Sequence, residues 1–232
     1  MILRPIRRFW KRHLTRPVWH DLRSTTPLSR TFGLDRGTPV DRYYIQQFLE
    51  QQKSVITGSV LEIGDDTYTK RYGHEVRRSD VLHVRPAPGG RVIAGDLTMR
   101  ETLPGAVYDC CICTQTLNFI YDVREAVKGV HSLLRPGGTV LATVAGLCQI
   151  SRYDMERWGD YWRFTTASAR RMFDEVFDEG ASTVISYGNV LSAVAFLEGL
   201  ASDELNPEEL DRRDDDYQVV ICIAARRTHE VD

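Results

Sequence analysis

The sequence predicts an α/β fold in which a doubly wound, mostly parallel sheet carries helices on both faces. Short, almost continuously apolar runs alternate with segments of helical periodicity, which is the pattern of parallel strands buried beneath helices. A chain of 232 residues suits one such domain with an added terminal segment. The content of 42% hydrophobic and 27% charged residues is that of a globular protein and excludes collagen-like and disordered chains.

The predicted domain occupies residues 41–232, after a basic extension over residues 1–40. Its first helix is expected over 41–52, where the apolar side chains share one face and Asp41 suits the first turn. The segment Arg135-Pro136-Gly137-Gly138 predicts a hard turn. Further helices are expected over 123–134 and 166–177, and strands over 59–63, 81–84, 91–94, 108–114, 139–144, 183–187 and 218–225.

The N-terminal extension differs in charge from the rest of the chain. Residues 1–23 hold seven basic side chains and one acid, whereas the remainder holds 23 basic and 31 acidic side chains, a formal charge of -8. An acidic body does not favour nucleic acid as a partner. In the extension, apolar residues recur at three- and four-residue intervals with basic residues between them, which predicts an amphipathic helix of the kind that anchors at membrane surfaces. The alternative is that this helix packs on the domain itself.

The cysteines and the apolar runs bear on the compartment. Five cysteines are present, and Cys110, Cys111 and Cys113 crowd one predicted interior strand. No second pair at zinc-ligand spacing accompanies them, so we expect buried thiols and no metal site. Apolar runs such as 219–225 are too short to span a bilayer. We therefore expect a cytoplasmic protein that touches membranes at most peripherally.

The loop after the first predicted strand indicates which class of ligand the domain binds. In an open parallel sheet, ligands bind beyond the carboxyl ends of the strands. Here Gly64 is followed by Asp65 and Asp66, so only the first glycine of a dinucleotide fingerprint is present. Two carboxylates in this place would repel a pyrophosphate. The loop therefore argues against NAD or FAD and favours a cationic or zwitterionic ligand.

Two further acids lie near predicted strands. Asp80 follows Gly64 by 16 residues, and a carboxylate there can accept hydrogen bonds from a ribose, although a surface acid at a strand edge fits the spacing equally well. Asp96 stands between Gly95 and Leu97 at a strand end, where it can accept a hydrogen bond from an exocyclic amine. A Gly-Asp pair also simply makes turns, so each acid alone is a weak signal.

The order of these segments resembles the seven-strand, Rossmann-like methyltransferases that use S-adenosylmethionine. The resemblance covers residues 41–225 and rests on Val60–Gly64 as the first motif, on Gly95–Leu97 as the adenine-contacting motif, and on Tyr108-Asp109 followed by Leu134–Gly138. It implies a seven-stranded sheet and S-adenosylmethionine as cofactor. It also implies a set of cofactor-binding residues at the strand ends: Glu62, Gly64, Asp65, Tyr68, Asp80, Asp96, Leu97 and Gln115.

One departure from that family concerns the glycine loop. The family usually has G-x-G-x-G after the first strand, whereas Gly64 is followed by acids. The cofactor has no phosphates and needs no phosphate cradle, and Asp65 or Asp66 can meet its ammonium group or a ribose hydroxyl. A second, softer resemblance concerns residues 32–37 and 41–45, which are similar to small bacterial methyltransferases associated with glycan assembly.

The segment after the strand at 139–144 is the expected acceptor wall. Residues 151–165 combine Trp158, Tyr161 and Trp162 with acids and arginines, and aromatic faces beside carboxylates suit sugar rings. Asp154 and Asp160 are the candidate catalytic bases, because a hydroxyl acceptor needs a base within hydrogen-bond reach. The alternative is a capping loop with core aromatics and surface ion pairs.

Together, these features predict a metal-independent S-adenosylmethionine-dependent methyltransferase. The expected reaction is O-methylation of a small polar or glycan hydroxyl. A second hypothesis is a catalytically silent domain of the same fold that binds a membrane or a partner, which the altered glycine loop and the basic extension both favour.

Overall fold

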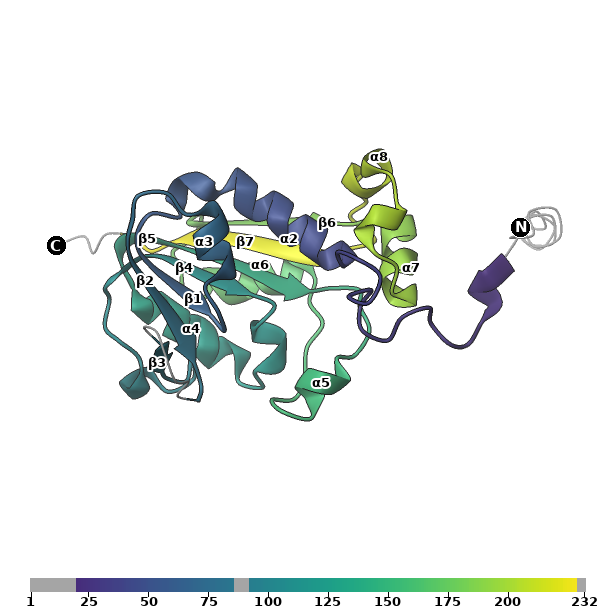
Figure 1. The fold of residues 1–232 in the computed structure, drawn as a ribbon. Coiled ribbons are helices and arrows are strands. Elements are labelled where there is room, and N and C mark those ends of the chain that lie inside the picture. Colours follow the sequence, from purple (N-terminus) through teal and green to yellow (C-terminus); the bar gives the residue numbers. More distant parts are fainter. Residues whose placement is uncertain (1–19, 86–91, 229–232) are drawn as a thin grey trace, which may run out of the picture.

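The computed structural model describes residues 20–85 and 92–228 as an α/β domain with one central sheet (Figure 1). The strand order is β3-β2-β1-β4-β5-β7-β6. All neighbours run parallel except β7, which is antiparallel to both β5 and β6. The strands are β1 (Gly58–Ile63), β2 (Val76–His83), β3 (Val92–Ala94), β4 (Tyr108–Thr114), β5 (Leu134–Ala145), β6 (Ser182–Tyr187) and β7 (Val220–Arg226). The predicted seven-stranded, mostly parallel sheet is confirmed.

Helices cover both faces of this sheet, as Figure 1 shows for α2 on one side and α4 on the other. One core cluster packs the apolar faces of α4 and α6 against the sheet, and a second packs α2, α3 and α7 against the opposite face. The helices are α2 (Val40–Gln51), α3 (Thr67–Tyr72), α4 (Val123–Leu133), α5 (Arg152–Met155), α6 (Thr166–Asp174), α7 (Val190–Glu198) and α8 (Pro207–Asp211). Short 3₁₀ segments are η1 (His20–Arg23), η2 (Lys53–Val55), η3 (Arg100–Thr102), η4 (Leu117–Phe119) and η5 (Ser202–Glu204).

The expected hard turn at residues 135–138 is wrong, because these residues form part of β5. Tyr108 pairs with Leu134, while Cys110 pairs with Thr139, so the extra residues bulge out of the ladder. Gly137 makes this possible with a φ of +81°, a conformation that glycine adopts at no steric cost. The turn-forming sequence therefore makes a bulge within a strand.

The cysteines of β4 are buried free thiols, as expected. Burial raises the pKa of Cys113 to about 12, which leaves it protonated and inert at neutral pH. In the part of the chain that the structure describes, no helix is long and apolar enough to cross a membrane. The expected helix of the N-terminal extension falls in residues 1–19, which lie outside the described residues.

Candidate active site

A cavity of about 580 Å³ opens at the carboxyl ends of the central strands. Its lining includes the last residues of β1, β4 and β5, which are Ile63, Thr114 and Ala145. The start of α2 and the segment around α5 form its walls. This is the position at which open α/β sheets bind ligands, because the loops diverge there.

Glu62, near the end of β1, holds the loop between β1 and α3 in place. Its carboxylate accepts hydrogen bonds from the amides of Tyr68 at 3.0 Å and Thr69 at 2.7 Å, and from the Thr69 hydroxyl at 2.7 Å. Burial raises the pKa of Glu62, although these hydrogen bonds oppose the shift. Glu62 thus lines the cavity but uses both oxygens to fix the start of α3 to the end of β1.

Gly64 follows β1 with a φ of +93°, and a Cβ built there would meet no described atom within 4 Å. Its neighbour Asp65 lines the cavity and accepts a hydrogen bond from the Thr67 amide at 2.8 Å. The open space beside Gly64 is the kind of cradle that a ligand fills.

Gln115 holds the corresponding place after β4. Its φ is +46°, a strained value for a residue with a side chain. Its amide donates to the Thr143 carbonyl at 2.8 Å, which ties the strained turn to β5. Gln115 lines the same cavity as Glu62, Asp65 and Tyr68, so four of the expected cofactor-binding residues come together.

Asp80 lies elsewhere, which corrects the expectation that it faces the ligand. It pairs with Leu61 three residues before the end of β2 and is only 2% exposed. Its carboxylate accepts from the Tyr108 hydroxyl at 2.8 Å and pairs with Arg78 at 2.5 Å. The carboxylate is therefore satisfied inside the domain, away from the strand end.

Asp96 and Leu97 also lie apart from the cavity. Asp96 Oδ1 accepts from both the amide and the hydroxyl of Thr98 at 2.8 Å, which closes a turn after β3. Leu97 is 4% exposed and belongs to the core beneath α4. Leu97 is therefore a core residue that packs beneath α4. The expected contact between Asp96 and adenine stays a prediction.

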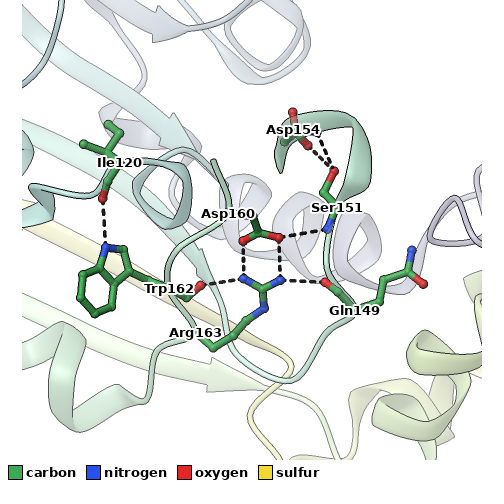
Figure 2. Close-up of polar contacts among 7 residues, drawn as sticks. All are labelled: Ile120, Gln149, Ser151, Asp154, Asp160, Trp162 and Arg163. Atoms are coloured by element: carbon green, nitrogen blue, oxygen red, sulfur yellow. Dashed lines mark hydrogen bonds and ion pairs between the residues drawn. The ribbon is translucent and has the colours of Figure 1, made fainter. Parts of the chain in front are cut away.

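The expected acceptor wall is held together by an ion pair (Figure 2). Asp160 is 8% exposed and binds both terminal nitrogens of Arg163 and the Ser151 amide. Burial raises its pKa, but the hydrogen bonds from Arg163 and Ser151 outweigh burial and hold that pKa below its usual value. A base paired in this way is a poor proton acceptor, which corrects the assignment of Asp160 as a catalytic base.

Asp154 keeps a place in the site. It lines the cavity, and its Oδ2 accepts from the Ser151 hydroxyl at 2.6 Å (Figure 2). The Ser151 hydroxyl in turn accepts from the Asp154 amide at 3.2 Å and caps α5. This reciprocal capping orients the carboxylate at the edge of the cavity.

Trp158, Tyr161 and Trp162 pack beside the cavity, whereas Tyr153 of the same segment lines it. Trp162 stacks on Tyr121 with ring centroids 6.0 Å apart, and its indole nitrogen donates to the Ile120 carbonyl at 3.0 Å. Tyr161 meets Tyr121 edge to face at 5.4 Å. Trp158 contacts His83 at 5.9 Å, at the end of β2. The predicted aromatic wall is thus a cluster on the neighbouring surface.

The sequence reasoning missed two polar residues of this cavity. Among the described residues, Asp41 Oδ1 and Asn118 Oδ1 are buried without a hydrogen-bond partner, and both side chains line the cavity. Burial raises the pKa of Asp41, in spite of the nearby Arg42. The one sequence signal was the similarity of residues 32–37 and 41–45 to a group of methyltransferases, since this segment supplies Phe32, Leu34, Asp41 and Arg42 to the cavity.

The comparison with protein families identifies a methyltransferase domain over residues 69–142. The match begins after Gly64, so the altered glycine loop lies outside it. A search of the curated proteins finds no significant match.

Several solved structures share the fold. The N-methyltransferase NodS from Bradyrhizobium japonicum WM9, in complex with S-adenosyl-L-homocysteine, is 15% identical with a TM-score of 0.53 over 88% of this chain and 95% of that one. An S-adenosylmethionine dependent methyltransferase from Mesorhizobium loti is 16% identical, with a TM-score of 0.51 over 84% and 100%. The cyclase SpnF is 14% identical, with a TM-score of 0.52 over 83% and 84%.

The structural similarity establishes the fold, but at such low sequence identity it leaves the reaction open. The presence of a cyclase among the similar structures illustrates this. The methyltransferase-domain match over residues 69–142 agrees with the resemblance to the class I S-adenosylmethionine-dependent methyltransferases, and the solved structures show that the fold is shared.

Proposed function

We propose that this chain, a class I methyltransferase by its fold and domain match, transfers the methyl group of S-adenosylmethionine to a hydroxyl of a small polar or glycan acceptor. The observation that carries the proposal is the cavity at the ends of β1, β4 and β5. Its lining combines Asp65, which follows Gly64, with a second carboxylate, Asp154, from the segment around α5. One side suits a cofactor and the other suits an acceptor.

The residues present fit the cofactor. When bound, S-adenosylmethionine supplies an electrophilic methyl group on a sulfonium. Asp65 and Gln115 lie at the strand ends that flank the open space, and Asp41 and Asn118 offer buried acceptor oxygens without partners among the described residues. Buried polar atoms are normally satisfied, so such orphans in a cavity are the mark of an absent ligand. The chain's task is then to hold the two reactants in line.

The acceptor side favours a polar molecule. A second cavity of about 400 Å³ adjoins the first and shares Arg30, Gln149 and Arg152 with it. The hydroxyls of Ser24 and Thr25 contribute to its lining. This space is large enough for an acceptor beside the cofactor and offers many hydrogen-bonding groups. Asp154 is the base that we assign to the acceptor hydroxyl, because it stands at the edge of the cavity without an arginine partner among the described ion pairs.

A screen of labelled methyl transfer tests this proposal. Sugars, lipid-linked glycans and small alcohols form one set, and amines of matched size form the other. Transfer to hydroxyl compounds alone supports the proposal. Transfer to amines alone contradicts the O-methyl assignment while keeping the methyltransferase.

The altered glycine loop favours the second candidate, a silent domain of the same fold. Calorimetry with S-adenosylhomocysteine separates the two candidates, because a silent domain without a cofactor site shows no heat of binding.

A further inference from the structure

We infer that Asp41 and Arg42 form a cradle for the amino-acid end of the cofactor, with Asp41 meeting the ammonium group and Arg42 the carboxylate. The inference rests on the proposed function. The two residues are consecutive in the first turn of α2 and both line the cavity. Their opposite charges match those of a zwitterion whose two charged groups are joined through a single carbon.

The glycine loop that usually holds the amino-acid end of the cofactor is altered in this chain. The loop after β1 carries acids where the family has glycines. Glu62, at the end of β1, has both oxygens engaged by the amides of Tyr68 and Thr69. Glu62 is therefore not free to bind an ammonium group. Of the two loop acids only Asp65 lines the cavity, and one of its oxygens is already held by the Thr67 amide, so a further acid from another element completes the site.

The surroundings of Asp41 suit a cationic ligand. An acid in the first turn of a helix normally has a lowered pKa, because the helix N-terminus favours its charge. Burial instead raises the pKa of Asp41, and its Oδ1 has no hydrogen-bond partner among the described residues. Such an oxygen destabilises the folded chain unless a donor meets it. A bound ammonium group supplies that donor and the matching charge.

The surroundings of Arg42 suit an anionic ligand. Its Nη1 donates to the Tyr68 hydroxyl at 3.0 Å, and Tyr68 lines the same cavity. The ion pairs of the described residues do not include Arg42. A guanidinium has five donor hydrogens in a planar fork that fits a carboxylate. The hydrogen bond to Tyr68 orients Nη1, and the other N–H groups of the guanidinium can donate to a carboxylate in the cavity.

The test compares two ligands that differ only at the amino-acid end. S-adenosylhomocysteine carries this end, whereas 5′-deoxy-5′-methylthioadenosine keeps the adenosine and the sulfur and lacks it. Calorimetry measures the affinity of the full chain for both. In Asp41→Asn and Arg42→Gln we expect S-adenosylhomocysteine to bind about ten- to hundredfold more weakly, with no change for the thioadenosine.

Matched controls come from α4 and α3. Glu125→Gln removes an acid that pairs with Lys128 at 2.6 Å, and Arg71→Gln removes an arginine that lies over Tyr72. Neither residue lines the cavity, and neither substitution is expected to change either affinity. Thioadenosine binding also reports folding, because a misfolded variant loses it.

Each result is decisive. If both ligands bind both variants as they bind the wild type, the cradle is refuted and the proposed function stands. If both affinities fall together, the residues are structural and the cradle is again refuted. If the wild type binds neither ligand, the proposed function fails and the cradle fails with it.

Discussion

Arg163 forms a bidentate ion pair with Asp160, in which Nη1 lies 2.5 Å from Oδ1 and Nη2 lies 2.9 Å from Oδ2 (Figure 2). The same guanidinium donates to the carbonyls of Trp162 and Gln149 at 2.8 Å. One side chain thus joins the segment that leaves β5 to the segment that enters α6. The pair fixes the wall of the cavity and leaves proton transfer to other groups.

Replacing Asp160 with asparagine should cost stability. The carboxylate is 1% exposed and its loss leaves Arg163 without its counter-charge, so we expect a loss of about 2–4 kcal/mol. Since the pKa of Asp160 is lower in the folded than in the unfolded protein, the pair contributes fully above the unfolded pKa, and its contribution is lost as the pH falls through the folded pKa. Denaturant unfolding of both proteins against pH should therefore show curves that converge in acid. A constant gap at every pH would contradict the ion-pair account.

Asp154→Asn should act on turnover. Asparagine can still accept the hydrogen bond that Ser151 donates to Asp154 at 2.6 Å, so the fold of α5 is kept. Without a base, methyl transfer to a hydroxyl should slow about 10²- to 10⁴-fold, with unchanged affinity for S-adenosylhomocysteine. Single-turnover rates and calorimetry measure the two quantities. A slowing of less than tenfold would place the base elsewhere or show that the acceptor needs none.

Gly129→Ala should destabilise the domain. A Cβ at Gly129 in α4 would lie 2.0 Å from the Leu97 carbonyl oxygen. The helix must then move from the turn that follows β3, at a cost of about 1–3 kcal/mol. Gly105→Ala is the matched control, because no described atom lies within 4 Å of its Cβ. Thermal unfolding of the two variants should differ clearly, and equal midpoints would mean that α4 does not pack against Leu97 this closely.

The basic extension should bind anionic membranes. Each basic side chain near an anionic surface contributes about 1 kcal/mol, and residues 1–23 hold seven of them. The full chain should co-sediment with anionic vesicles at low salt and dissociate at high salt. A variant with Arg7, Arg8, Lys11 and Arg12 changed to glutamine should stay in the supernatant, as should the wild type with neutral vesicles. If the wild type also stays in the supernatant, or if the variant binds equally, the extension is not a membrane anchor.

The sequence predicted the fold better than its details, and the reasons are physical. The sequences of β1, of β4 and of residues 139–144 in β5 are nearly continuous apolar runs. Burial on both faces of a sheet explains such runs. In contrast, α7 is apolar almost throughout, so it has no periodicity to reveal it. Its capping box of Asn189 and Ser192 was the available signal.

The site was predicted unevenly for a related reason. Gln115 and Asp65 were found because strand ends are visible in the sequence. Asp80 and Asp160 were misassigned because a sequence does not show which acid has an arginine beside it, as Arg78 and Arg163 do here. Asp41 was missed because an acid in a first helical turn has an ordinary explanation, and only its burial reveals otherwise.

The position of β7 in the sheet has a consequence for folding during synthesis on the ribosome. This strand is the last of the described strands in sequence order, yet it lies between β5 and β6 in the sheet. Until it emerges, both of those strands present open edges, which are templates for pairing with other chains. Val219, directly before β7, also lines the cavity. A nascent chain that stalls before residue 219 is therefore aggregation-prone and has an incomplete binding site, because the same segment completes both the sheet and the site.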